Sequence, residues 1–213
     1  MTDVWSDRAA LYVDSDAHRE GPDLDLLVEW AAGAATALDV ATGGGHVARR
    51  LRDEGIEVVS CDPAPGMHPN VICAAEDLPF ADGSFEVVAT RVAAHHFADV
   101  AKAVREMARV ASTRLLIVDN LFMGDGVEQA ERLRDPCHVR NYSDAEWKSL
   151  VEAAGLVIDD VRYFDKPIAF QPWLDRTGCV GEDAERARAL LESRIDGDVV
   201  TLDRIAIKSR KEI

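Results

Sequence analysis

The sequence predicts an α/β protein built on a doubly wound, mostly parallel sheet. Short apolar segments alternate with amphipathic helical segments as far as residue 119, and the first of these strands ends in three consecutive glycines. Such alternation is typical of a parallel sheet covered by helices, which binds ligands at the carboxyl ends of its strands. A length of 213 residues suits one such unit with additions, so we expect a single domain over residues 1–213.

The glycine-rich stretch that follows the first strand is the centre of this prediction. Residues 37–41 form an apolar strand, residues 43–45 are glycines, and residues 46–54 have an amphipathic helical pattern. Glycine adopts positive φ and lets a ligand approach the main chain, while free N–H groups at a helix start attract negative charge. We therefore expect a nucleoside ligand with an anionic or polar tail at this turn.

The remaining elements follow from apolar spacing and from turn residues. Asp99 is a predicted N-cap, and Ser143 with Glu146 forms a predicted capping box. Three prolines between residues 62 and 70 leave no room for a normal crossover helix, so we expect a turn there. The predicted helices cover residues 24–32, 99–109, 127–134, 143–154 and 182–193, and the further strands cover residues 56–61, 71–74, 85–90, 114–119, 157–164 and 199–207.

Composition excludes several classes of function. The net charge of −15 would repel a nucleic-acid backbone or an anionic membrane, so we expect neither as a partner and favour a small neutral or cationic substrate. We find no basic and apolar leader pattern and no apolar run of about 18 residues, so we expect a cytoplasmic protein. The four cysteines lack C-x-x-C spacing and the adjacent histidines 95 and 96 suit a metal poorly, so we expect no metal site.

The glycine pattern alone does not identify the ligand. Gly43, Gly45 and Ala48 also satisfy the dinucleotide fingerprint. Asp62 ends the second strand 17 residues after Gly45, and its carboxylate can accept hydrogen bonds from ribose hydroxyls in either cofactor class. The features that separate the classes are Asp39 inside the first strand and the segments 75–88 and 91–97.

These segments, in this order, resemble the class I S-adenosylmethionine-dependent methyltransferases. The resemblance covers residues 5–163 and is strongest to the ubiquinone/menaquinone-biosynthesis type (methyltransferase type 11) of small-molecule methyltransferase. It implies a Rossmann-like, seven-stranded sheet with the last strand antiparallel, S-adenosylmethionine as cofactor and S-adenosylhomocysteine as product. Two departures are Ala41, where the family has its first glycine, and Ala74, where many relatives have aspartate.

The resemblance also implies roles for individual residues. Asp39 and the glycine turn would hold the methionine part of the cofactor, Asp62 the ribose, and Met67 the adenine face, with the loop after residue 74 at the adenine edge. The full implied cofactor set is Tyr12, His18, Asp39, Thr42, Gly43, Gly44, Gly45, Asp62, Pro63, Met67, Ala75, Glu76, Asp77, Leu78, Arg91 and Val92.

Two segments lie outside the predicted sheet, one at the N-terminus and one between the last two strands. In relatives an N-terminal piece folds over the cofactor, so residues 1–32 would form a lid and helices, with Tyr12, Ser15 and His18 closing the pocket. An exposed helix without ligand contact is the alternative. The apolar anchors predicted for this N-terminal piece are Ala10, Leu11 and Val13. Residues 165–198 are too long for a simple turn and form an insertion that either walls the substrate pocket or makes a homodimer contact.

Methyl transfer gains most from holding the nucleophile and the methyl group within reach in a dry site. An acceptor hydroxyl or acidic carbon also needs a base, for which His96, His95 and His138 are the candidates. Arg91 is expected to pair with a carboxylate, and Asp119 either faces the acceptor or caps a turn.

The leading hypothesis is methyl transfer to an oxygen, carbon or nitrogen atom of a small-molecule acceptor. The alternatives are a nicotinamide-dependent reductase and a non-catalytic S-adenosylmethionine-binding regulatory protein. Against the reductase, neither Tyr142 nor Tyr163 is followed four residues later by lysine. A nucleic-acid base methyltransferase is disfavoured because residues 91–96 lack a D/N-P-P-Y turn.

Overall fold

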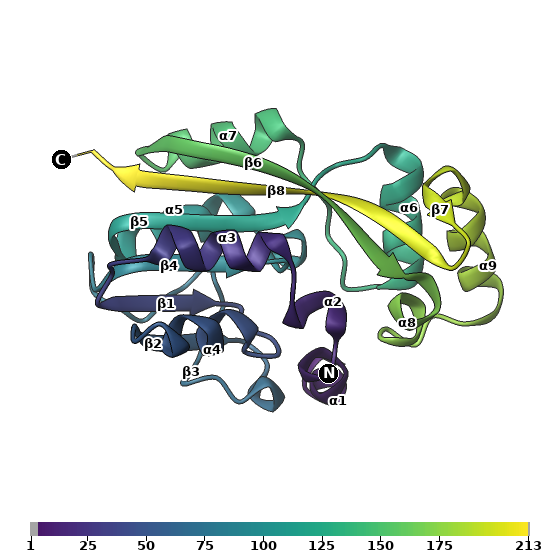
Figure 1. Cartoon of the computed structure of the whole chain (residues 1–213), viewed down its shortest axis with the longest axis horizontal. Helices are drawn as coiled ribbons and strands as arrows, with labels where there is room; N and C mark the ends of the chain where they lie inside the picture. Colours follow the sequence, from purple (N-terminus) through teal and green to yellow (C-terminus); the bar gives the residue numbers. More distant parts are fainter. Residues whose placement is uncertain (1–3, 213) are drawn as a thin grey trace.

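The computed structural model describes residues 4–212 and confirms the predicted α/β class (Figure 1). The sheet has the order β3-β2-β1-β4-β5-β8-β6, with a short β7 paired to β8. The first five strands pair in parallel and β8 runs antiparallel to both β5 and β6, as expected for the class I methyltransferase fold. The strands are β1 (Thr36–Val40), β2 (Glu57–Asp62), β3 (Val71–Ile72), β4 (Phe85–Arg91), β5 (Ala111–Asn120), β6 (Leu156–Ala169), β7 (Ile195–Asp196) and β8 (Val199–Lys211).

Helices cover both faces of this sheet, and a further group lies beyond its end (Figure 1). α3 and α4 pack on one face, and α5 and α7 pack on the other. The helices are α1 (Val4–Val13), α2 (Asp16–Arg19), α3 (Pro22–Ala31), α4 (His46–Asp53), α5 (Val100–Val110), α6 (Asp125–Arg134), α7 (Asp144–Ala153), α8 (Phe170–Asp175) and α9 (Gly181–Leu190). None of the described helices is long and apolar enough to span a bilayer.

The two faces of β5 show why the strands are apolar throughout. Leu115 and Ile117 belong to the core beneath α5 and α7, whereas Leu116 and Val118 belong to the core beneath α3 and α4. Successive side chains of a strand point to opposite faces, so a strand covered on both sides must be apolar at every position. This burial places the ends of the strands, rather than their middles, where polar side chains can meet a ligand.

Several predicted boundaries and turns are confirmed. Asp99 accepts a hydrogen bond from the Lys102 amide, and the capping box of Ser143 and Glu146 is formed at α7. The proline-rich connection after β2 contains only a 3₁₀ turn, Pro65–Met67. That turn replaces the full helix that a parallel crossover normally carries.

Three local predictions are wrong. α5 continues directly into β5, so this strand begins at Ala111 rather than at the predicted residue 114. β6 extends to Ala169 rather than ending at residue 164, because an edge strand tolerates the missing N–H of Pro167. The predicted apolar anchors Leu11 and Val13 are 50% and 44% exposed, and the buried residue of α1 is Ala9.

The far ends of β6 and β8 form a ribbon that carries a third apolar core. Figure 1 shows α6, α8 and α9 gathered around this ribbon, beyond the end of the parallel strands. Trp173 and Phe170 of α8 are buried there beside Val127 of α6. The segment between β6 and β8 therefore packs on the chain that follows β5, although the two segments are separate in sequence.

Candidate functional site

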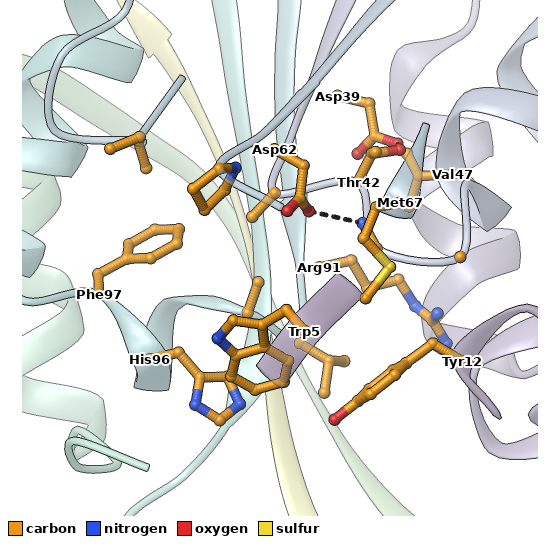
Figure 2. Close-up of a pocket in the computed structure, with 18 of the residues that line it drawn as sticks. Trp5, Tyr12, Asp39, Thr42, Val47, Asp62, Met67, Arg91, His96 and Phe97 are labelled. Atoms are coloured by element: carbon orange, nitrogen blue, oxygen red, sulfur yellow. Dashed lines mark hydrogen bonds between the residues drawn. The ribbon is translucent and has the colours of Figure 1, made fainter. Parts of the chain in front are cut away.

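A cavity of about 280 Å³ opens at the carboxyl ends of β1, β2 and β4. Ligand sites in proteins typically measure roughly 300–1,000 Å³, so this cavity suits a small molecule. Figure 2 shows Asp39 and Asp62 on one side of the cavity, with Trp5, Tyr12 and His96 across from them. The walls therefore combine residues that follow the strands with residues of the N-terminal helix α1.

The glycine turn after β1 presents its main chain to the cavity. Gly43 and Gly45 have φ values of 50° and 73°, in the left-handed region that favours glycine. A side-chain carbon on Gly44 would lie 2.8 Å from the carbonyl oxygen of Tyr12, so this glycine permits α1 to approach. The turn therefore forms part of the cavity wall and also leaves room for α1 to lie over the cavity.

Two residues other than glycine also adopt the left-handed backbone conformation at the cavity. Ala41 and Val92 each have φ of 55°, and both line the cavity. A left-handed conformation costs an L-residue roughly 1–2 kcal/mol. Strain of this kind is concentrated at functional sites, where the surrounding structure enforces it.

Asp62 ends β2 with its carboxylate at the glycine turn. Its Oδ2 accepts a hydrogen bond from the Gly43 amide at 3.0 Å (Figure 2), and its Oδ1 accepts one from the Ala64 amide at 2.9 Å. These two bonds fix the orientation of the carboxylate, whose oxygens only accept hydrogen bonds when it is ionised. This geometry suits a diol such as that of ribose.

Asp39 lies deeper, inside the first strand. Its Oδ2 accepts hydrogen bonds from the Thr42 hydroxyl at 2.5 Å and the Ala48 amide at 3.0 Å. Burial raises the pKa of this carboxyl to about 6, although both hydrogen bonds act in the opposite direction, and the charge of Asp62 adds to the rise. Asp39 therefore fixes the turn and adds negative charge to the cavity near neutral pH.

The N-terminal helix is held over the cavity by main-chain contacts. Nε2 of His46 donates to the carbonyl oxygen of Tyr12 at 3.0 Å, and the Ser6 hydroxyl accepts from the Gly66 amide at 2.7 Å. A side-chain carbon on Gly66 would lie only 2.5 Å from the Cα of Ser6. These contacts bring Tyr12 to the cavity wall. Residues 1–3 of the predicted lid lie outside the described part of the chain.

Arg91 forms the buried ion pair that the sequence predicted. Its guanidinium contacts Oδ2 of Asp23 at 2.8 Å and also donates to the His18 carbonyl at 2.7 Å. Arg204 donates to the same Asp23 oxygen at 3.0 Å. Burial alone would raise the pKa of Asp23, but the two guanidinium charges hold it below its ordinary value. Arg91 lines the cavity with its charge already paired.

Two of the three candidate histidines are engaged with buried carboxylates. Nδ1 of His95 donates to Asp119 at 2.6 Å, and the net effect of that charge is a raised pKa although burial opposes it. His138 lies 3.3 Å from both Glu128 and Glu131, and burial lowers its pKa. Asp119 therefore holds His95 rather than facing the cavity, and His138 lies away from the cavity wall.

His96 is the candidate histidine that reaches the cavity. Its Nδ1 donates to the carbonyl oxygen of Cys137 at 3.1 Å, which requires the proton on Nδ1 because a carbonyl only accepts. Burial and the neighbouring His95 push the pKa of His96 well below its ordinary value. The neutral ring thus keeps a lone pair on Nε2. The Trp5 indole packs edge-on against the His96 ring, with 4.6 Å between the ring centroids.

The structure brings most of the predicted site residues together. Ser15, Gly45, Asp77, Leu78, His95 and His138 do not line the main cavity, and Leu78 is a core residue. The predicted residues that line it are Tyr12, His18, Asp39, Thr42, Gly43, Gly44, Asp62, Pro63, Met67, Ala75, Glu76, Arg91, Val92 and His96. Lining residues that the sequence analysis missed are Trp5, Ala41, His46, Val47, Ala74, Ala93, Phe97 and Ala98.

Some of these missed residues could have been found from the sequence pattern, and others could not. Ala93 and Phe97 lie inside the segment 91–97 that the sequence singled out, and Ala98 follows it directly. Trp5 and His46 gave no local signal, because their positions depend on how α1 docks. Among residues 4–212, no group of three or more potential metal ligands is arranged to bind an ion.

Comparisons with known proteins agree with this geometry. A family model described as "Methyltransferase domain" matches residues 38–114. The "Uncharacterized methyltransferase YcgJ" of Bacillus subtilis is 36% identical over 198 residues, which cover 82% of this chain and 78% of that protein. A demethylmenaquinone methyltransferase of Beutenbergia cavernae is 37% identical over 83 residues, 34% of this chain and 35% of that protein.

Solved structures extend the similarity to the whole fold. The crystal structure of Bacillus subtilis YcgJ has a TM-score of 0.80 at 31% identity and covers 90% of this chain and 98% of that chain. A putative methyltransferase from Bacillus halodurans also has a TM-score of 0.80 at 31% identity, with 91% and 100% covered. The likeness therefore extends well beyond the segment matched by the family model.

Proposed function

Because the chain belongs to the class I S-adenosylmethionine-dependent methyltransferases, we propose that its main cavity binds S-adenosylmethionine and that it methylates a small-molecule acceptor. The observation that carries this proposal is the position of Asp62, whose carboxylate is fixed beside the Gly43 amide at the end of β2. The matched region includes the glycine turn and Asp62, and the cavity has the size of a small-molecule site. When bound, the cofactor would supply an activated methyl group on its sulfonium.

The residues around the turn fit the two ends of such a cofactor. In this proposal Asp62 accepts the ribose hydroxyls, and Gly43 and Gly44 lie along the methionine part with Asp39 behind them. Met67 packs on the adenine, with Ala75 and Glu76 at its edge, and all three residues line the cavity. Tyr12 and Trp5, which approach from α1, exclude water from the reacting atoms.

Among the histidines, we assign the role of base to His96. Its Nε2 lone pair is free because Nδ1 is committed to the Cys137 carbonyl, and the ring lines the cavity. With the cofactor bound, an acceptor hydroxyl or acidic carbon would give its proton to Nε2 as the acceptor's new bond to the methyl carbon replaces the bond from that carbon to sulfur. His95, held by Asp119 with its ring 4.1 Å from that of His96, would position the base rather than act as one.

The other roles considered for the chain rank below this one. The family assignment displaces the nicotinamide-dependent reductase. A regulatory protein without turnover would bind the same cofactor, so only turnover separates it from the enzyme. The insertion contributes Trp173 and Arg176 to a small second cavity beside the main one, which supports the pocket-wall role, and the homodimer contact stays a prediction.

Binding of S-adenosylhomocysteine tests the proposal. At 100 times its dissociation constant a ligand stabilises a protein by about 2.7 kcal/mol, which corresponds to several degrees in Tm. We expect Asp62→Ala and Asp62→Asn to lose most of this shift while remaining folded by circular dichroism. The exposed Asp53→Ala should keep the full shift. A Tm shift with NADH and none with S-adenosylhomocysteine would refute the proposal.

A further inference from the structure

A second, smaller cavity adjoins the main one on the side of the insertion. Its free volume is about 30 Å³, and four residues, Tyr12, His18, Val92 and His96, line both cavities. The remaining lining comes from the turn after β4, from β5, β6 and β8, and from the helical segments around α6 and α8. It consists of His95, Asn120, Arg134, Ile168, Trp173, Arg176, Leu202 and Arg204. A molecule that reaches past Tyr12 and His96 from the main cavity would enter this space.

The charge of this small cavity is opposite to that of the whole protein. Three arginines line it, and no carboxylate does so among the described residues, although the chain carries a net charge of −15. Arg204 is already satisfied, because it donates to Asp23 at 3.0 Å and to Asn120 at 3.2 Å. The following contacts show whether a carboxylate pairs with the other two arginines, Arg134 and Arg176.

Arg134 uses only part of its donor capacity. Its Nε donates to the Trp173 carbonyl at 2.9 Å, and its guanidinium lies over the Trp173 ring at 4.4 Å. Within residues 4–212 no carboxylate oxygen lies within 4.0 Å of its nitrogens. A guanidinium has five N–H donors, so the two terminal nitrogens remain available to an anion.

Arg176 has still fewer partners. It is only 8% exposed, and the described part of the chain offers its guanidinium no carboxylate within 4.0 Å and no hydrogen bond. The Tyr12 ring lies 6.0 Å away. Burial and the nearby charge of Arg134 lower the pKa of Arg176 to about 10, so it stays charged at neutral pH. A buried charge without a counter-charge is costly, which indicates that an anion from solution completes the site.

The acidic residues near these arginines are engaged elsewhere. Asp135 pairs with Arg8 at 3.3 Å, and Glu131 lies 3.3 Å from His138. Asp119 holds His95, and the exposed Asp175 accepts a hydrogen bond from Gln171. Although Oδ2 of Asp135 and Oε1 of Glu131 accept no hydrogen bond, no carboxylate oxygen of the described residues lies within 4.0 Å of the guanidinium of Arg134 or Arg176.

We propose that the methyl acceptor carries a carboxylate or phosphate group, which enters the small cavity and pairs with Arg134 and Arg176. This inference rests on the proposed function, because it places the nucleophilic atom on the other side of Tyr12, beside His96. A water needs about 10–15 Å³ of such space, so 30 Å³ accommodates about two oxygens, which favours a carboxylate. The planar guanidinium fork binds a carboxylate through two parallel hydrogen bonds.

Such a site would select its substrate by charge. An acceptor without the anion would leave two buried arginines unpaired, and a site with unpaired buried polar groups rejects the analogue strongly. The local charge of the cavity, rather than the net charge of the chain, would then decide which small molecules bind.

Isothermal titration with simple anions tests the site. The probes are benzoate, phenyl phosphate and neutral benzamide, each titrated into the protein alone and into the protein saturated with S-adenosylhomocysteine. We expect benzoate to bind and benzamide not to bind. Arg176→Gln should weaken benzoate binding about 10-fold or more, since hydrogen bonds to charged groups contribute roughly 1.5–3 kcal/mol. Arg176→Lys should recover part of the affinity, and the exposed Arg186→Gln of α9 should match the wild type.

The outcomes separate this inference from the proposed function. Unchanged benzoate and phenyl phosphate affinity in folded Arg176→Gln, equal binding of benzamide and benzoate, or no anion binding would overturn the site. Binding of phenyl phosphate alone, with the same dependence on Arg176, would support the site with phosphate as the anion. If the anion binds through Arg176 but S-adenosylhomocysteine does not bind, the proposed function fails while the anion site stands.

Discussion

Replacing Asp39 by asparagine should increase stability near neutral pH while weakening cofactor binding. The carboxyl is buried, and its pKa is about 6 against an ordinary 3.8. The difference of about 2 pH units, at 1.36 kcal/mol per unit, means that ionised Asp39 costs the folded state about 3 kcal/mol. Asparagine cannot ionise, but its NH₂ group brings donors into a buried site, which offsets about 1–3 kcal/mol of that gain.

The cost of ionising Asp39 is measured better by how stability changes with pH than by the stability at one pH. Between pH 4 and pH 6 the folded wild type binds more protons at Asp39 than the unfolded chain does, so this group lowers stability as pH rises. The stability of Asp39→Asn relative to wild type should therefore rise by about 2 kcal/mol between pH 4 and pH 6 and level off above pH 7. The histidines titrate in both proteins and cancel in the comparison.

Urea unfolding at pH 4.5, 5.5, 6.5 and 7.5, followed by circular dichroism, measures this difference. Asp53→Asn, an exposed change on α4, is the control and should show no such trend. Titration with S-adenosylhomocysteine should show about 10-fold weaker binding for Asp39→Asn, a trade of function for stability. A stability difference that does not vary with pH would refute the reasoning about Asp39.

Two further predictions concern the base and the cover of the cavity. Nitrogen NMR of the histidine rings should show His96 neutral at pH 6.5, with its proton on Nδ1. Burial lowers the pKa of His96, and the Cys137 carbonyl accepts a hydrogen bond from Nδ1. A charged ring, or a proton on Nε2, would contradict the assignment of His96 as base. Gly66→Ala should displace α1, because the new carbon would lie 2.5 Å from the Cα of Ser6, and should give several-fold weaker S-adenosylhomocysteine binding and faster tryptic cleavage at Arg8. Gly126→Ala, whose new carbon meets nothing closer than 3.8 Å, is the control, and equal behaviour of the two alanine variants would show that α1 does not cover the site.

The sequence by itself determined the sheet, the glycine turn and the residues at the ends of its strands. These features have local signatures: an apolar strand, a turn that requires positive φ at Gly43, and a helix start directly after it. Since the carboxyl ends of parallel strands meet at one edge, Asp62 could be placed beside that turn before any coordinates.

Only the tertiary structure decided which charges are paired and which cavity each residue lines. Asp23 and Arg204 are 181 residues apart in the chain, and Arg8 donates to the carbonyl of Thr177 across 169 residues. No periodicity or turn signal encodes such contacts, because they depend on how α1 and the insertion dock against the sheet. For the same reason Arg134 and Arg176 look like ordinary surface arginines in the sequence, and only their burial without a carboxylate partner reveals a site for an anion.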